Sequence, residues 1–133
     1  MVLSRQAAEF AAEIRLHDWS DSPYRADRAG HQRSMDEERP TVKQLNADET
    51  DCVKLNVMWV AAQVLSYSDP NFDAHEFAEA CGVSHGFIYT NRGSKSGVIT
   101  AGLRSDQGGF HRPGTYTSAL PEPSNAPNGT ASS

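Results

Sequence analysis

Residues 72–95 read FDAHEFAEACGVSHGFIYTNRGSK, and the interpretation of the whole chain starts from this stretch. Two short runs with helical apolar spacing lie on either side of Gly82-Val83-Ser84. This arrangement is typical of a helix-turn-helix, whose second helix lies against DNA. The 133 residues are enough for one modest domain, and we expect that domain to contain this stretch.

Two signals predict the same start for the first short helix. Asp73 as N-cap, with Glu76 three residues later, resembles a capping box. Phe72 and Phe77 have the spacing of a hydrophobic staple around that cap. Gly82 is expected to end the helix, because glycine adopts a positive φ at little cost.

Four small or aliphatic residues define the corner between the two helices. Ala78 permits a close approach of helices that meet at a steep angle, and Gly82 follows four residues later. Val83 would fill the corner, and Ile88 would lie on the inner face of the second helix. We therefore predict a recognition helix over residues 84–92, placed to enter the major groove.

The sequence GVSHGFIYTNRGSKSGVI, residues 82–99, resembles the second half of the DNA-binding region of TetR-type regulators. The family pattern is G-V-S-x-G-x-[LI]-Y-x-x-F-x-[SD]-K. The matching residues are Gly82, Val83, Ser84, Gly86, Ile88, Tyr89, Ser94 and Lys95. The similarity is looser upstream and covers about residues 55–99. It implies an all-α unit whose short second helix lies in the major groove.

The resemblance also implies which residues contact DNA. Tyr89 and Lys95 match family positions that touch phosphates. The residues expected to face the bases are His85, Gly86, Phe87 and Thr90. Arg92 and Arg104 join Lys95 as the basic residues of a run, residues 83–104, that contains no acid. The acids of the preceding helix are expected to lie away from the groove.

Three departures from the family pattern limit the resemblance. Arg92 stands where the family has a buried Phe, and Asn91 is polar where an aromatic residue or His is common. Only 34 residues follow Ile99, too few for the family's helical ligand-binding domain. We therefore expect the DNA-binding unit without a sensor domain. Three cations imply modest affinity, so tight binding would need a homodimer or a second protein.

Two further helices are expected to support this unit. Ser4 is a candidate N-cap for a helix within residues 1–18. Asn46 and Glu49 form an approximate capping box at the start of a long scaffold helix, residues 46–67. The apolar residues of this helix form a broad stripe, which suggests burial on more than one side.

The remaining segments are assigned from their composition. Asp, Ser, Arg and Glu dominate residues 19–45, where we expect a disordered, solvated linker. The helix-turn-helix domain would span 46–104, and residues 105–133 would be a flexible tail. Two interpretations of residues 98–116 stay open: a short helix, which we favour, or a hairpin wing beside the recognition helix.

Composition and charge limit the function classes. A formal net charge of −5 argues against a general nucleic-acid coat, although it permits one local basic face. Two distant cysteines, Cys52 and Cys81, indicate free thiols in a cytoplasmic protein. No run approaches the length of a membrane span, and the first residues lack a signal-peptide pattern.

No catalytic, cofactor or metal site is predicted. His75, Cys81 and His85 lack the paired spacing of zinc ligands, and no phosphate-binding or dinucleotide motif occurs. We expect a non-enzymatic, all-α protein that binds duplex DNA and regulates transcription or assists a DNA transaction. The alternative is a protein-interaction or virion-assembly adaptor on the same scaffold. The alternatives differ in whether Phe87 and Tyr89 are exposed on one positive face.

Overall fold

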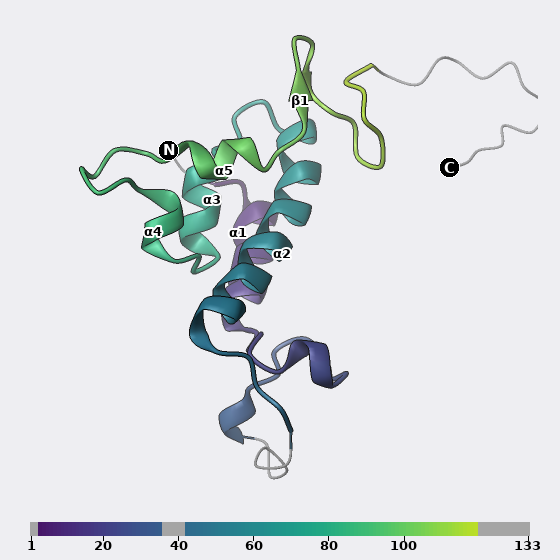
Figure 1. Ribbon diagram of the computed structural model, residues 1–133. Helices are drawn as coiled ribbons and strands as arrows, with labels where there is room; N and C mark the ends of the chain where they lie inside the picture. Colours follow the sequence, from purple (N-terminus) through teal and green to yellow (C-terminus); the bar gives the residue numbers. More distant parts are fainter. Residues whose placement is uncertain (1–2, 36–41, 120–133) are drawn as a thin grey trace, which may run out of the picture.

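The structure is a computed structural model and describes residues 3–35 and 42–119. Within these ranges the chain forms five α-helices and then a two-stranded hairpin (Figure 1). It also forms two 3-10 turns, η1 (Ser22–Tyr24) and η2 (Arg33–Met35). The predicted all-α class is confirmed. No helix of the described part is long and apolar enough to cross a membrane.

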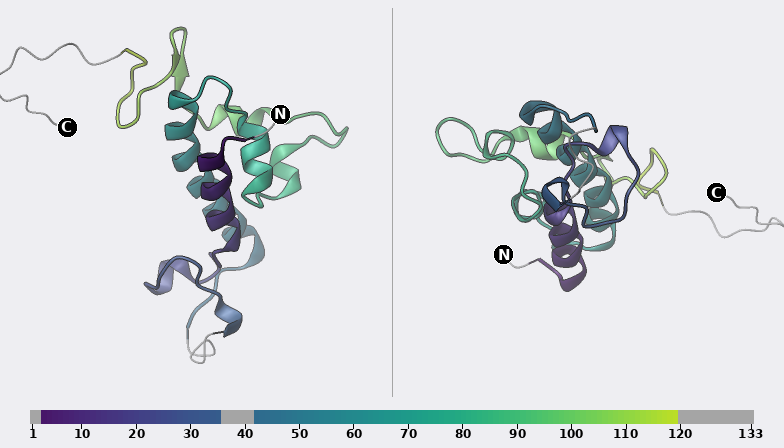
Figure 2. Two further views of the ribbon diagram at one scale, coloured as in Figure 1. Left: turned by 180° about the vertical axis from the view of Figure 1, so that it is seen from behind. Right: turned by 90° about the horizontal axis from the view of Figure 1, so that it is seen from below.

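The two longest helices lie side by side and form the long axis of the molecule (Figure 2). They are α1 (Arg5–Leu16) and α2 (Ala47–Ser68). Ser4 caps α1 as predicted. A reciprocal capping box starts α2: Asn46 Oδ1 accepts from Glu49 N at 2.8 Å, and Glu49 Oε1 accepts from Asn46 N at 3.0 Å. Local capping therefore fixes where both helices begin.

Three short helices complete the core. They are α3 (Ala74–Ala80), α4 (His85–Ile88) and α5 (Gly97–Ala101). α3 is central, since it contacts each of the other four helices, and its Phe77 is fully buried. The apolar core comprises Ala7, Ala11, Ile14, Leu55, Met58, Ala62, Leu65, Ala74, Phe77, Ala78, Cys81, Val83, Ile88, Ile99 and Leu103.

Residues 98–116 combine parts of both open interpretations. A short helix is present, as α5, and a small antiparallel hairpin follows it. The hairpin consists of β1 (Ser105–Asp106) and β2 (Gly109–Phe110). It packs against α2 and stands apart from α4, so it is not a wing beside the recognition helix (Figure 1). Residues 120–133 of the predicted tail lie outside the described residues.

The prediction of a disordered linker is wrong for the described part of residues 19–45. Residues 18–35 fold into a loop beyond the end of α1 (Figure 1). Asp21 lies fully buried at its centre, where it accepts from His31 Nε2 at 3.0 Å and Arg33 Nη1 at 3.3 Å. The charges of this segment neutralise one another inside the loop, which composition alone does not reveal.

Candidate nucleic-acid interface

The corner between α3 and α4 has the predicted construction. Gly82 has a φ of +82°, and Val83 N donates to Ala78 O at 3.1 Å across the turn. Ala78, Val83 and Ile88 are buried. Main-chain geometry and small apolar contacts therefore set the direction in which α4 leaves α3.

The predicted start of α3 is also present. Asp73 Oδ1 accepts from the backbone N–H groups of His75 and Glu76 at 3.0 and 3.1 Å. The rings of Phe72 and Phe77 lie 5.3 Å apart, centroid to centroid, as a hydrophobic staple requires. α3 is thus fixed at both ends, and it holds the rest of the unit in place.

The predicted recognition helix, residues 84–92, is wrong in its extent. α4 is a single turn that ends at Ile88, and no side-chain hydrogen bond caps its start. Residues 89–95, which we name the α4–α5 loop, turn back on themselves. Tyr89 and Lys95 pair across the base of this loop as an isolated antiparallel bridge.

Turn chemistry in the α4–α5 loop explains why the helix stops. Thr90 Oγ1 accepts from the backbone N–H groups of Arg92 and Ser94 at 3.3 and 3.2 Å. Such local side-chain bonds compete with helical ones. Gly93 has a φ of +84°, a conformation that glycine adopts readily. The signal is visible in the sequence as Asn91-Arg92-Gly93-Ser94, a run of turn-forming residues interrupted only by Arg92.

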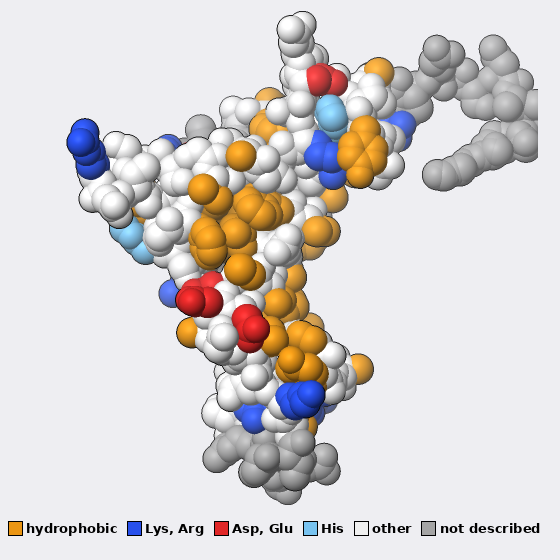
Figure 3. Space-filling model, viewed as in Figure 1, with side chains coloured by type: hydrophobic (Ala, Val, Ile, Leu, Met, Phe, Trp, Pro, Cys, Tyr) orange, Lys and Arg blue, Asp and Glu red, His pale blue; other side chains and the backbone are white. Residues whose placement is uncertain are grey.

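The α4–α5 loop projects from the helices and carries positive charge at its tip (Figures 1 and 3). Arg92 is exposed, and no carboxylate of the described residues forms an ion pair with it. Lys95, at the base, is also exposed. Beside them His85 and Thr90 are exposed, on α4 and at the start of the loop. Together with exposed Gly86, these residues form one outward surface.

The two aromatic residues of this region are half-buried and pack against the core. Tyr89 Oη donates to Glu79 Oε2 at 2.9 Å, and this bond raises the pKa of Tyr89 above its ordinary value. The His85 ring lies 4.7 Å from the Tyr89 ring. Phe87 and Tyr89 therefore support the surface from beneath, which leaves less of each ring for DNA than the sequence suggested.

Acidic side chains border the surface, contrary to the expectation that the acids of α3 lie away from it. Glu79 bonds to Tyr89, and Asp73 Oδ2 lies 3.9 Å from Lys95 Nζ. The positive potential is therefore concentrated at the tip of the α4–α5 loop, around Arg92. Electrostatic attraction for an anion is strongest there.

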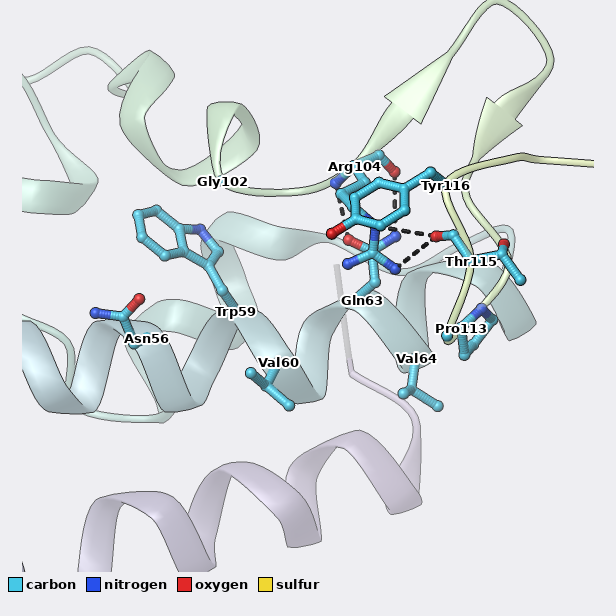
Figure 4. Close-up of a pocket in the computed structure, with 11 residues that line it drawn as sticks. Asn56, Trp59, Val60, Gln63, Val64, Gly102, Arg104, Pro113, Thr115 and Tyr116 are labelled. Carbon is cyan, nitrogen blue, oxygen red and sulfur yellow. Dashed lines mark hydrogen bonds between the residues drawn. The ribbon is translucent and has the colours of Figure 1, made fainter. Parts of the chain in front are cut away.

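Arg104 lies apart from the other predicted residues. Its guanidinium donates to Thr115 O at 3.0 and 3.1 Å and stacks over the ring of Tyr116 (Figure 4). Its backbone N donates to Gln63 Oε1 at 2.8 Å, and Gln63 Nε2 donates back to Arg104 O at 3.1 Å. Arg104 thus joins α2 to the turn after the hairpin, and we place it outside the candidate interface.

A separate cavity of about 470 Å³ was missed by sequence reasoning. It lies between α2 and the turn after the hairpin, and Trp59, Val60 and Tyr116 contribute to its lining (Figure 4). The residues that form it are up to sixty positions apart, so no local motif reveals it. Within 3–35 and 42–119, no three His, Cys, Asp or Glu side chains gather as metal ligands would.

Comparison of the chain with models of protein families, with curated proteins and with solved structures finds no match in any of the three. Function is therefore argued from the geometry and charge of the molecule.

Proposed function

We propose that this protein binds duplex DNA through α4 and the α4–α5 loop, as a transcriptional regulator or an assistant in a DNA transaction. The observation that carries the proposal is the exposed Arg92, on a loop that projects from a helix-turn-helix corner. Its neighbours His85 and Thr90 provide polar groups on the same surface. The similarity to TetR-type regulators supports the proposal for the residues up to Tyr89. From Tyr89 onward the chain has left α4, so the support from the similarity ends there.

The short α4 changes how DNA would be contacted. A single turn presents few side chains to base edges, so base recognition would rest mainly on His85 and Thr90. Arg92 and Lys95 would contact phosphates and set the position of α4 on the duplex. Binding of this kind has limited sequence specificity, and two phosphate contacts give only a shallow dependence of affinity on salt.

The charges around the surface predict modest affinity for one chain. Two cations face outward from the loop, while Glu79 and Asp73 border it and the whole chain carries a net charge of −5. Long-range repulsion therefore opposes the local attraction, except where salt screens it. The cation pair is the feature that an experiment should remove.

The test is fluorescence anisotropy of a labelled genomic duplex, titrated with protein at several salt concentrations. R92A plus K95A removes both loop cations. Each lost phosphate contact reduces the magnitude of the negative slope of log K against log salt by about 0.9. The loss of two contacts should therefore lower the affinity roughly 50-fold at about 0.1 M salt. The matched control, R5A plus K43A, removes two exposed cations elsewhere and should retain nearly full affinity.

Two outcomes would refute DNA binding by this surface. One is no salt-dependent binding of the unaltered protein, and the other is an equal loss in both double variants. Either outcome would favour a protein-interaction or virion-assembly adaptor. The bond between Tyr89 and Glu79 is the observation that favours this second function, because it holds a negative carboxylate on the surface that also carries Arg92.

A further inference from the structure

The tip of the α4–α5 loop is a tight β-turn. Gly93 N donates to Thr90 O at 2.9 Å, the bond that joins the first and fourth residues of such a turn. Asn91 and Arg92 are its two central residues, so their side chains leave the chain at the outer end of the loop. A further bond, from Thr90 N to Ser94 O at 2.8 Å, holds the two arms of the loop together below the turn. The tip is therefore narrow and fixed in shape.

Small, uncharged neighbours leave the Arg92 side chain accessible from several sides. All residues from 90 to 95 are exposed, and a Cβ at Gly93 would meet no atom within 4 Å. Asn91, Gly93 and Ser94 are short beside the long side chain of Arg92. Figure 3 shows the basic tip standing clear of the acidic side chains on this face of the molecule. Arg92 can therefore reach beyond its own loop into a narrow space.

The acids near this surface lie at the base of the loop. Glu79 bonds to Tyr89, and Asp73 lies beside Lys95, the two residues that pair across the base. From the base to Arg92 the chain advances three residues, which is at most about 10 Å. Phosphates that approach the tip thus stay farther from both acids than phosphates that approach the base. The charges favour contact with DNA through the tip.

We propose that the tip of the α4–α5 loop enters the minor groove of A·T-rich DNA, with Arg92 between the two phosphate rows and Asn91 at the base edges. Such insertion rests on the proposed function and names the class of DNA that this same surface would prefer. A narrow A·T minor groove has an enhanced negative potential that attracts an inserted arginine. Arginine and asparagine are among the residues that read this groove, where A·T pairs present only acceptors. The side-chain amide of Asn91 can donate to those acceptors.

The major groove fits the tip less well. That groove is about 12 Å wide, and proteins read it with a helix or a two-stranded ribbon that carries about three or four base-reading side chains. The tip offers only Asn91 and Arg92, and α4 is a single turn. The minor groove is about 6 Å wide, which suits one guanidinium beside a short amide side chain. There both phosphate rows attract Arg92 at once, while His85 on α4 would stay at the edge of the adjacent major groove.

The test compares three duplexes of equal length and identical flanks by fluorescence anisotropy, at one fixed salt concentration of about 0.1 M. The first has an A·T-rich centre and the second a G·C-rich centre. In the third, inosine replaces every guanine in the centre of the second. Inosine lacks the amino group that G·C adds to the minor groove, and it keeps the acceptors of guanine in the major groove. The unaltered protein should bind the A·T and I·C duplexes about tenfold more tightly than the G·C duplex.

The variant R92K separates groove insertion from simple attraction to phosphate. Lysine keeps the charge, but its ammonium group is more strongly hydrated than a guanidinium and enters a narrow groove less readily. R92K should therefore keep the salt dependence of the unaltered protein and lose most of its preference for A·T pairs. Because Arg92 is exposed, the exchange leaves the fold intact. The matched control is R5K, the same exchange at the exposed Arg5 of α1, which should keep both properties.

The possible results separate minor-groove insertion from DNA binding as such. No binding of any duplex would refute the proposed function and minor-groove insertion together. Salt-dependent binding with equal affinity for all three duplexes would overturn minor-groove insertion alone and leave the proposed function standing. An I·C duplex bound as weakly as the G·C duplex would assign the preference to the major groove. A full A·T preference in R92K would remove Arg92 from the groove, and either of these two results overturns the inference.

Discussion

Replacing Gly102 by alanine should destabilise the protein strongly, because Trp59 occupies the space that a Cβ would need. A Cβ built at Gly102 overlaps Cε2, Nε1 and Cδ2 of the Trp59 indole. The φ of Gly102 is −82°, so the backbone itself accepts alanine and the effect is steric. Trp59 Nε1 also donates to Ile99 O at 2.8 Å, so the ring cannot move without losing this bond.

The expected magnitude follows from these two contacts. Forcing a side chain into packed space costs about 1–3 kcal/mol, and the lost hydrogen bond about 1 kcal/mol more. G102A should therefore lower the free energy of unfolding by about 2–4 kcal/mol. In a W59A background the obstacle is gone, so the same substitution should cost less than about 0.5 kcal/mol.

Urea unfolding followed by circular dichroism at the helical band measures all four members of this double-mutant cycle. G97A is the control, since Gly97 is the first residue of α5 and a Cβ there meets no atom within 4 Å. It should stay within about 0.5 kcal/mol of the unaltered protein or stabilise it. A G102A protein as stable as the unaltered one, or additive costs of G102A and W59A, would refute the packing argument.

Two further predictions concern titratable groups. Burial opposes ionisation of Asp18, yet hydrogen bonds from the Ser20 hydroxyl and from the backbone N–H groups of Ser20 and Arg33 lower its pKa below the ordinary value. These hydrogen bonds stabilise the fold fully at pH values above the pKa of Asp18 in the unfolded chain, and this stabilisation is lost as pH falls through the lower pKa of Asp18 in the folded protein. D18N should therefore weaken the fall of the urea unfolding midpoint with pH below about pH 4. Burial raises the pKa of Cys81 to about 12, so iodoacetamide at mildly alkaline pH should label exposed Cys52 alone until urea is added. Mass spectrometry detects this, and equal labelling of both thiols in the native protein would contradict the buried position of Cys81.

Local signals predicted a large part of the fold. The starts of α1, α2 and α3, the Phe72–Phe77 staple and the Gly82 turn all depend on residues within about five positions of one another. Such contacts are written into short stretches of sequence, so caps and staples can be recognised there. The apolar residues of α2 also indicated burial on more than one side, and α1, α3 and the hairpin do pack against α2, although Val60 and Val64 stay exposed.

Contacts between distant residues could not be predicted in this way. Gln63 bonds to Arg104 across 41 positions, and this bond draws Arg104 away from the candidate interface. His31 bonds to Asp21 in a segment whose balanced charges suggested a solvated linker. The end of α4, in contrast, depends on nearby residues, since Thr90 and Gly93 are turn signals that can be seen in the sequence. The resemblance to a longer recognition helix outweighed them.

Two main-chain hydrogen bonds close the base of the α4–α5 loop, and the Thr90 hydroxyl accepts two more from backbone N–H groups within it. Thr90 N donates to Ser94 O at 2.8 Å, and Ser96 N donates to Ile88 O at 2.8 Å. Neither bond needs the side chain of Asn91 or Arg92, which lie between them. Mutation can therefore diversify these two positions while the helices keep their stability. The chain is suited to acquire new binding preferences by drift, and a library randomised at this tip would make it a scaffold for selecting binders.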